Sequence, residues 1–401
     1  MTISNPHPYP FNDVTDELYV EPRLEQLRES EPLCPVRLPH GEPAWLVTRY
    51  EDVKTVLGDP RFSRARAVTS DEPRTRSHRG LPGNILDYDP PEHTRLRRVV
   101  AKAFTARRVE QMKERTQAIA DGLVDAMTAK GSPADLVAEF ALPLPVTVIC
   151  ELLGVPLEDR TRFRLWADAL LSTTRFTTEE VERYADELTA YMADLIAQRR
   201  KEPQDDLLSV MVSARDEEDR LSEDELVAMG VSVLVAGHET TASQIPNFVY
   251  TLLHHPRELA RLRADLDLVP QAVEELMRYV PLGEASIARY ALEDVELSGG
   301  VVRAGEPVVT SNVSANRDGT VYTCPEALDL TRQEASHVGF GHGPHHCLGA
   351  QLARMELQVT LRTLLARLPG LRLAGTGEDL VWKTGSAVRG LTRMLVAWGE
   401  E

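Results

Sequence analysis

The sequence predicts a mainly α-helical protein with a small β region, and two patterns carry this prediction. Apolar residues recur at positions i, i+3, i+4 and i+7 in five long stretches, which is the spacing of a helix face. These stretches are residues 106–130, 143–154, 178–200, 257–265 and 348–367. Strand-like alternation is confined to residues 44–50, residues 287–314 and the C-terminal end. With 42% hydrophobic content the chain can bury a large core, so we expect residues 1–401 to form a single domain.

The net charge excludes several classes of partner. A formal charge of -17 offers no broad basic surface for nucleic acid, and it disfavours contact with anionic membranes. Residues 1–22 lack the basic start and the apolar run of a signal peptide, and no segment has the roughly 18 consecutive apolar residues of a membrane span. We therefore expect a cytoplasmic, monomeric protein with no nucleic-acid or membrane partner.

Two stretches are predicted to be mobile covers over a site. Residues 64–93 form a connection that is too long and polar for an ordinary loop, and residues 171–180 are a second such stretch. Long loops on a helical scaffold often gate a binding site.

A long helix is predicted from residue 222 to about residue 255. Ser222 and Glu225 have the spacing of a capping box at its start. At 1.5 Å per residue the helix would span roughly 50 Å, so it must cross the core. Pro246 removes one backbone hydrogen bond inside it and predicts a kink.

The middle of this helix reads "AGHETT" (236 to 241), which places one acid and two hydroxyls in an apolar segment. One interpretation is a tight helix crossing with Glu239 turned to water. The other is a groove where a flat ligand presses on the helix, with Glu239 and Thr240 aimed into it. A buried and unpaired Glu239 would be costly, so either interpretation needs a partner for it.

Cys347 lies in "FGHGPHHCLG" (340 to 349), beside three histidines and before an apolar helical pattern. A sulfur at a helix N-terminus is favoured as a thiolate, and the glycines let the backbone approach a large planar ligand. A thiolate that is the only protein ligand of a haem iron favours O–O cleavage. The competing hypothesis is zinc held by Cys347 and the local histidines, although this spacing matches none of the usual structural zinc sites. We expect Cys34, Cys150 and Cys324 to be small hydrophobes.

These residues resemble a known family. "FGHGPHHCLG" matches the cysteine-loop signature of the cytochrome P-450 haem-thiolate monooxygenases at every defined position. "AGHETT" is similar to the family's oxygen-binding segment, "EELMR" (274 to 278) contains its Glu-x-x-Arg pair, and "DPPEHTRLRR" (89 to 98) is similar to the helix that cradles the haem propionates. The soluble bacterial class, and within it the actinomycete enzymes that tailor polyketides and macrolides, is the nearest likeness. The resemblance implies the cytochrome P-450 fold, with haem b between the long central helix and the cysteine-loop helix.

The resemblance also implies roles for single residues. Cys347 would be the axial ligand of the iron. The other haem contacts would be His93, Arg97, Ala236, Arg289, Phe340, His345 and Gly349. Glu239 and Thr240 would supply the two protons that cleavage of O2 needs, with Thr240 as the donor and Glu239 as the relay from solvent. The small Ala236 and Gly237 would leave room for the oxygen.

A pocket and a substrate class follow from the same likeness. The pocket walls would include Ile85, Leu86, Leu234, Val235, Leu282, Ile287 and Ala387. This set is apolar and suits a lipophilic molecule, so we expect hydroxylation or epoxidation of a polyketide or macrolide intermediate. A carrier-bound amino acid, a terpenoid, a fatty acid, a coupling reaction and a haem protein that does not oxygenate stay open as alternatives.

Electrons are expected from separate proteins, a ferredoxin and its reductase, because no flavin or nicotinamide fingerprint is present. Residues 93–109 carry basic side chains and no Asp or Glu. A solvated helix face is the ordinary explanation of such a run. The resemblance places it on the haem's proximal side, where Arg95, Arg98 and Lys102 would steer an acidic donor.

One departure from the family pattern concerns the Glu-x-x-Arg pair. The resemblance implies that Glu275 and Arg278 form a structural ion pair that fixes the loop before the cysteine. Relatives usually carry an arginine where Ala327 stands, and that arginine bridges to the glutamate. We expect Arg317 or Arg332 to substitute for it.

Overall fold

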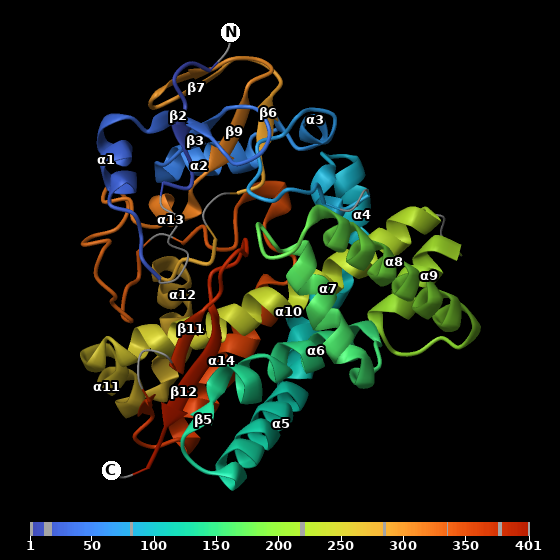
Figure 1. Cartoon of the computed structure of the whole chain (residues 1–401), viewed down its shortest axis with the longest axis vertical. Helices are drawn as coiled ribbons and strands as arrows, with labels where there is room; N and C mark the ends of the chain where they lie inside the picture. The colour runs from blue at the N-terminus through green and yellow to red at the C-terminus, as the bar shows by residue number, and fades with distance from the viewer. Residues whose placement is uncertain are drawn as a thin grey trace.

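The computed structural model describes residues 3–11, 18–80, 83–216, 221–283, 286–334, 336–375 and 379–399, and helices form most of it (Figure 1). The longest helices are α5 (Ala106–Lys130), α8 (Thr178–Lys201), α10 (Glu223–Leu253) and α14 (Ala350–Arg367). The others are α1 (Arg23–Ser30), α2 (Tyr50–Gly58), α3 (Ala65–Val68), α4 (Glu92–Ala101), α6 (Pro143–Leu153), α7 (Arg160–Leu170), α9 (Leu207–Asp216), α11 (Pro256–Ala264), α12 (Val269–Tyr279) and α13 (Asn312–Ala315). The mainly helical class predicted from the sequence is confirmed.

The strands gather in two main sheets. The first has the order β1-β2-β3-β9-β6-β4 and lies near the N-terminus (Figure 1). Its strands are β1 (His7–Pro8), β2 (Leu33–Arg37), β3 (Ala44–Val47), β4 (Phe62–Ser63), β6 (Arg289–Ala291) and β9 (Pro307–Thr310). The second has the order β10-β12-β11, with β5 also paired to β12, and β7 pairs β8 separately. These strands are β5 (Ala134–Asp135), β7 (Val295–Leu297), β8 (Gly300–Val302), β10 (Arg372–Leu373), β11 (Leu380–Trp382) and β12 (Leu391–Ala397).

Helix α10 crosses the middle of the helical part (Figure 1). Its predicted capping box is present: the Ser222 hydroxyl accepts from the Glu225 N–H at 3.1 Å, and the Glu225 carboxylate accepts from the Ser222 N–H at 2.8 Å. The helix is assigned without a break through Pro246, so the kink stays a prediction.

Helix α6 packs tightly against α10 at Gly237. A Cβ added to Gly237 would lie 2.5 Å from Cδ1 of Ile149. The tight crossing is therefore real, and it uses one face of the "AGHETT" turn. Gly237 serves this packing, and the expectation that it also leaves room for oxygen stays a prediction. An α-helix turns about 100° per residue, so the adjacent Ala236 lies on a different face, where it is exposed.

The sequence placed most element boundaries to within a few residues, with two corrections. Strand β3 ends at Val47, and Tyr50 already begins α2. The β region over residues 287–314 ends at Thr310, because the Ser311 hydroxyl accepts from the Ser314 N–H and starts the short helix α13. Of the two predicted covers, residues 171–177 form the loop between α7 and α8, and the other contains the short helix α3.

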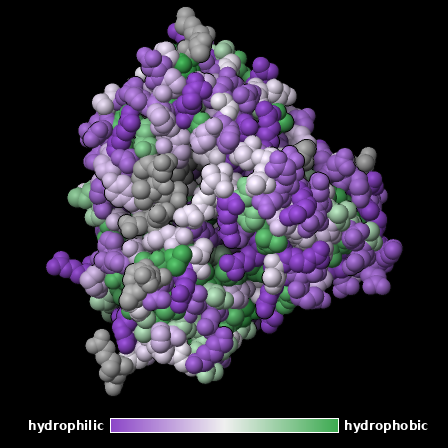
Figure 2. Space-filling view, viewed as in Figure 1, coloured by the Kyte–Doolittle hydropathy of each residue, from purple (hydrophilic) through white to green (hydrophobic). Residues whose placement is uncertain are grey.

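The surface visible in Figure 2 is mostly hydrophilic, with apolar residues scattered over it. Within the described residues, no helix is both long and apolar enough to cross a membrane.

Candidate active site

Cys347 sits in a tight loop that precedes α14. The Cys347 N–H donates to the Phe340 carbonyl at 2.9 Å, which closes the loop on itself. Gly341 and Gly343 both have positive φ, at 74° and 71°, a region that side chains disfavour. A Cβ on Gly343 would also lie 2.4 Å from the Leu57 carbonyl oxygen. Glycine is therefore required at position 343 by both conformation and contact.

The Cys347 thiol is exposed to an open space inside the fold. Surrounding protein raises the pKa of this thiol, while the Gly349 N–H, Arg97 and Arg354 lower it. A Cβ added to Gly349 would meet no atom within 4 Å, so the volume beside the thiol is empty of protein. Helix α14 begins at Ala350, three residues beyond the cysteine, with its N-terminus toward the sulfur.

A cluster of basic side chains lies close to the cysteine loop. The rings of His93 and His345 are 4.2 Å apart between centroids, and Arg97 donates to the His346 carbonyl at 2.7 Å. Burial lowers the pKa of His345 to about 3, assisted by the charges of His93 and Arg289. The structure therefore brings together four of the predicted haem contacts, namely His93, Arg97, Arg289 and His345.

Within the described part of the chain no carboxylate forms an ion pair with this cluster, although the charge of Asp89 acts to raise the pKa of His93 and of Arg289. Arg289 is 5% exposed, and its recorded hydrogen bond is a 3.5 Å contact with the Ile287 carbonyl. Burial lowers the pKa of Arg289 to about 10, so its guanidinium stays charged near neutral pH. Nδ1 of His345 is buried without a partner. Asp89, the nearby acid, accepts from the N–H of Arg64 at 2.8 Å. Buried cations without partners are costly, so these groups call for an anion.

The third part of the site is the exposed face of α10. Ala236 is exposed, and the Thr240 hydroxyl donates to the Ala236 carbonyl at 3.0 Å. Glu239 is 2% exposed and its carboxylate accepts a hydrogen bond from Lys383. Its second oxygen, Oε2, is buried without a partner. The first interpretation is right about the tight crossing at Gly237, but its expectation that Glu239 turns to water is wrong, because that side chain is buried against Lys383. The open face that the second interpretation needs is present at Ala236.

The sequence analysis missed Lys383. It follows β11 in the turn that leads to β12, and its ammonium group also donates to the Ser243 hydroxyl at 2.8 Å. The acid Asp168 on α7 lies near enough for the charge of Glu239 to raise its pKa, although burial is the larger cause. Asp168 pairs at 3.2 Å with Arg175, whose side chain is 52% exposed. A chain of ionisable groups thus leads from Glu239 to the surface.

Comparison with known proteins identifies the family. Residues 24–369 match the cytochrome P-450 family. The chain belongs to the cytochrome P-450 family. It is 53% identical to mycinamicin IV hydroxylase/epoxidase of Micromonospora griseorubida, over 99% of this chain and 100% of that protein. It is 52% identical to nocardicin C N-oxygenase of Nocardia uniformis subsp. tsuyamanensis, with the same coverage. The crystal structure of HinD with NMFT and NO superposes with a TM-score of 0.95 at 47% identity, covering 98% of this chain and 99% of that one.

This cytochrome P-450 is a haem-thiolate monooxygenase, and its residues fit protoporphyrin IX haem. The open volume at Gly349 lies beside the Cys347 thiol. Among the described residues, that thiol belongs to no group of three side chains that could together hold a metal ion. The uncompensated Arg289 and the orphaned Nδ1 of His345 match the two propionates, which are the anions that haem carries.

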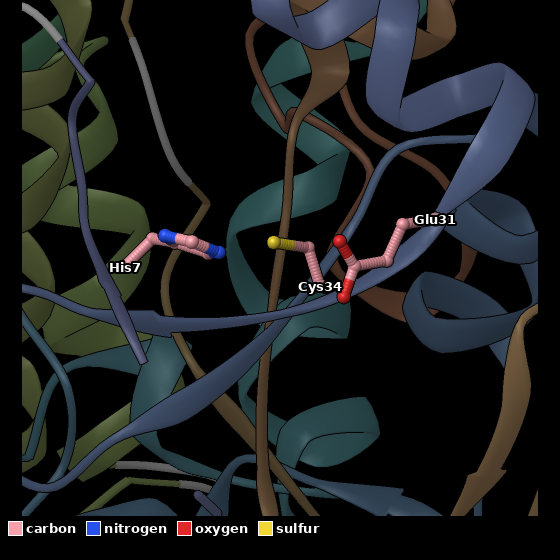
Figure 3. A group of neighbouring side chains, drawn as sticks. All are labelled: His7, Glu31 and Cys34. Atoms are coloured by element: carbon pink, nitrogen blue, oxygen red, sulfur yellow. The ribbon is translucent and has the colours of Figure 1, made fainter. Parts of the chain in front are cut away.

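The zinc hypothesis for the cysteine loop is not supported. In the described part of the chain, only His7, Glu31 and Cys34 place three potential ligand atoms within 4.8 Å of one another, on and beside β1 and β2 (Figure 3). Cys34 is fully buried, as expected of a small hydrophobe, and burial followed by the charge of Glu31 raises its pKa to about 11. That thiol is neutral at ordinary pH, and the cluster does not include Cys347.

The predicted pocket residues fall into three groups. Leu282 and Ala387 line a cavity of about 220 Å³ together with polar residues such as Gln244 and Asn312. Leu86, Val235 and Ile287 keep exposed surface, which in Ile287 amounts to 39%. Ile85 and Leu234 are buried, at 9% and 1%, and neither lines this cavity.

The Glu-x-x-Arg network is complete despite Ala327. Arg278 donates to both oxygens of Glu275, at 2.7 and 2.8 Å, and both side chains are 2% exposed. Arg278 also donates to the carbonyls of Asn316, Pro325 and Ala327. Arg332 donates to Glu275 at 3.1 and 3.2 Å. Arg332 is therefore the substitute.

Arg317, the other candidate, bonds elsewhere. Its guanidinium pairs with Glu326 and donates to the Tyr279 carbonyl at 2.9 Å. One further expectation needs correction, because Arg95 pairs with Glu225 at 2.5 Å and is not free to steer a donor. Arg98 and Lys102 are exposed on the same segment.

Proposed function

We propose that this cytochrome P-450 inserts one oxygen atom from O2 into a lipophilic natural product, by hydroxylation or epoxidation of a polyketide or macrolide intermediate in antibiotic biosynthesis. One observation carries the proposal. The Cys347 thiol faces an open volume beside a cluster of basic side chains that form no ion pair among the described residues. The name of the relative that is 53% identical, a hydroxylase/epoxidase of mycinamicin IV, supports the substrate class. The proposal takes residues 1–401 as one catalytic domain that works in the cytoplasm as a monomer.

In this proposal Cys347 would bind the haem iron, and Arg289, His345, His93 and Arg97 would hold the propionates. Phe340, Gly349 and Ala236 would contact the macrocycle. Haem, when bound, supplies the redox-active iron at which O2 is reduced. The basic cluster fixes the orientation of the macrocycle, because two separate anions must each meet their own cations.

The protein's contribution to the reaction is to supply protons while excluding bulk water. The Thr240 hydroxyl would donate a proton toward the open face of α10. Glu239 would replace that proton through Oε2, the oxygen that has no partner, and would itself recover one along Lys383 and Asp168. Such positioned proton donors typically contribute about 10²- to 10⁴-fold to a rate.

Electrons would come from a ferredoxin and its reductase. Arg98 and Lys102 are exposed near the cysteine loop and would attract an acidic donor. The attraction between exposed charges is screened within about 10 Å at 0.1 M salt. The reduction rate should therefore fall with ionic strength, and it should fall less steeply in an Arg98→Gln/Lys102→Gln variant.

A single turnover experiment tests the proposal. The holoenzyme is mixed with mycinamicin IV, a surrogate ferredoxin and its reductase under ¹⁸O2, and the product is analysed by mass spectrometry. We expect a product that carries one ¹⁸O atom. A product that has lost hydrogen without gaining ¹⁸O would show a different oxidation and would contradict the proposal.

A further inference from the structure

A group of basic side chains gathers where the two predicted covers meet. We call it the roof cluster; its members are His40, Arg74, Arg76 and His78. The guanidinium of Arg76 donates to the carbonyl of Leu170, at the end of α7, at 3.1 Å. Residue 171 in turn accepts a 2.8 Å hydrogen bond from the N–H of Ala387, which lines the 220 Å³ cavity. The roof cluster therefore lies beside the wall of the candidate substrate pocket.

The polar atoms of the roof cluster are poorly satisfied. Both ring nitrogens of His78 and Nε of Arg74 are buried without a hydrogen-bond partner. Burial lowers the pKa of His78 to about 4, and the charges of Arg76 and Arg74 lower it further. The guanidinium of Arg76 donates a hydrogen bond to the Leu170 carbonyl, but a neutral carbonyl does not compensate a positive charge.

The acids close to the roof cluster form ion pairs with other arginines, and the charges of Glu72 and Asp87 act on Arg76 from a greater distance. Glu72 and Asp87 lie 3.1 and 3.6 Å from Arg64, and Asp71 lies 3.4 Å from Arg74. Among the described residues, no carboxylate is left within ion-pair distance of Arg76. Burial is the main cause of the lowered pKa of Arg76, yet its side chain keeps accessible surface.

A buried cation without a carboxylate in ion-pair distance is unfavourable in the free protein, because the more distant charges of Glu72 and Asp87 offset only part of the hydration that burial removes. A buried arginine without an ion pair is all the more unusual in this protein, because the whole chain carries a formal net charge of -17. A guanidinium presents parallel N–H donors that match the two oxygens of a carboxylate. The missing partner therefore has the chemistry of a carboxylate.

We propose that Arg76, with His78 beside it, binds a carboxylate on the substrate, at the end of the molecule remote from the oxidised atom. This inference rests on the proposed function and narrows its substrate class from neutral lipophilic molecules to lipophilic acids. The carboxylate would hold the apolar remainder of the molecule over the haem, as a second anchor for the position of oxidation.

Matched imidazole ligands test this proposal without knowledge of the natural substrate. An ω-imidazolyl alkanoic acid and the corresponding alcohol both place an imidazole on the haem iron, which shifts the Soret band and reports binding. A series of chain lengths covers the unknown distance from the iron to Arg76. Dissociation constants are measured for the wild type, Arg76→Gln, Arg76→Lys and the control Arg66→Gln, whose side chain is exposed on the same cover.

We expect the wild type to bind the acid roughly tenfold to a hundredfold more tightly than the alcohol at one chain length. Arg76→Gln should lose this preference and keep its affinity for the alcohol, Arg76→Lys should keep part of it, and Arg66→Gln should match the wild type. Equal binding of acid and alcohol by the wild type at every length would overturn the proposal, as would a full preference in Arg76→Gln. A protein that contains no haem and gives no Soret shift would instead refute the proposed function.

Discussion

Lys383 donates a hydrogen bond to the Glu239 carboxylate and a second one, 2.8 Å long, to the Ser243 hydroxyl. Glu239, the acid of the proposed proton relay, is therefore held by a lysine from a different element, the turn between β11 and β12. That turn is itself bound to the loop between α7 and α8, because the Thr173 N–H donates to the Gly385 carbonyl at 2.8 Å. The turn that contains Lys383 therefore contacts both Glu239 and the loop over residues 171–177.

Loss of Lys383 should impair proton supply more than folding. In Lys383→Gln, Glu239 loses its cationic partner in a buried position, so the carboxyl becomes a poorer proton relay. We expect haem content to stay normal while product formed per electron consumed falls about tenfold, with the difference released as hydrogen peroxide. The kinetic solvent isotope effect on turnover should change as well. The surface variant Lys130→Gln, which removes an exposed partner of Glu139, is the control. Unchanged coupling in Lys383→Gln would remove the lysine from the relay.

The two small residues of the "AGHETT" turn should respond differently to enlargement. Gly237→Val pushes a side chain against Ile149, so the free energy of unfolding should fall by about 1–3 kcal/mol. Combining it with Ile149→Ala should restore part of that loss. Ala236→Val extends into the open face and should weaken carbon monoxide binding while leaving the melting temperature near that of the wild type. The opposite pattern would show that the assignment of faces is wrong.

The Glu275 network gives a matched pair of variants. Arg332→Ala leaves the buried Glu275 with one cationic partner instead of two, and removal of a partner from a buried ion pair is strongly destabilising, by up to about 3–5 kcal/mol. We expect a lower melting temperature and faster haem loss. Arg317→Ala breaks a contact with Glu326, whose side chain is 54% exposed, and should have a smaller effect. If Arg317→Ala proved the more damaging, the network would be misassigned.

Glu356 on α14 predicts a pH dependence of stability. Its carboxyl is 1% exposed, and burial raises its pKa to about 8, an effect that the Thr241 hydroxyl offsets in part. Below pH 4.5 the group is protonated in both the folded and unfolded states. Between pH 4.5 and about 8 the folded state holds the proton that the unfolded state releases, so stability falls as pH rises.

Glu356→Gln removes this titration and is nearly isosteric. The melting temperature of the variant minus that of the wild type should therefore increase from pH 5 to pH 8. The exposed variant Glu110→Gln should show no such trend. A difference that stays constant across the range would mean that Glu356 does not titrate there.

Local patterns account for what the sequence analysis predicted correctly. The capping box at Ser222, the turn at Gly343 and the pair Glu275–Arg278 each depend on residues a few positions apart, and such relations are visible in a sequence. Cys347 was found for the same reason, since its loop is short and contiguous. The start of α13 was missed although the Ser311 cap is local, because the alternation before it continued to suggest a strand.

Long-range partners could not be predicted. Lys383 meets Glu239 across 144 residues, and Arg332 meets Glu275 across 57. No periodicity or spacing records such a contact, since it depends on how separate elements pack. The same limit explains why the pairing of Arg95 was not predicted. In the sequence Arg95 belongs to a basic run, but in the structure it is neutralised by Glu225 from α10. The role of Gly237 in packing likewise depends on Ile149 of a distant helix.

The central claim is that Cys347 is the thiolate ligand of a haem iron. The most direct measurement is the absorption spectrum of the purified protein after reduction with dithionite and exposure to carbon monoxide. We predict the long-wavelength Soret band of thiolate-ligated haem in the wild type and in Cys324→Ser, whose cysteine is an exposed control, and its loss in Cys347→Ser. A Cys347→Ser protein that keeps this band, or a wild type that binds haem without it, would contradict the account.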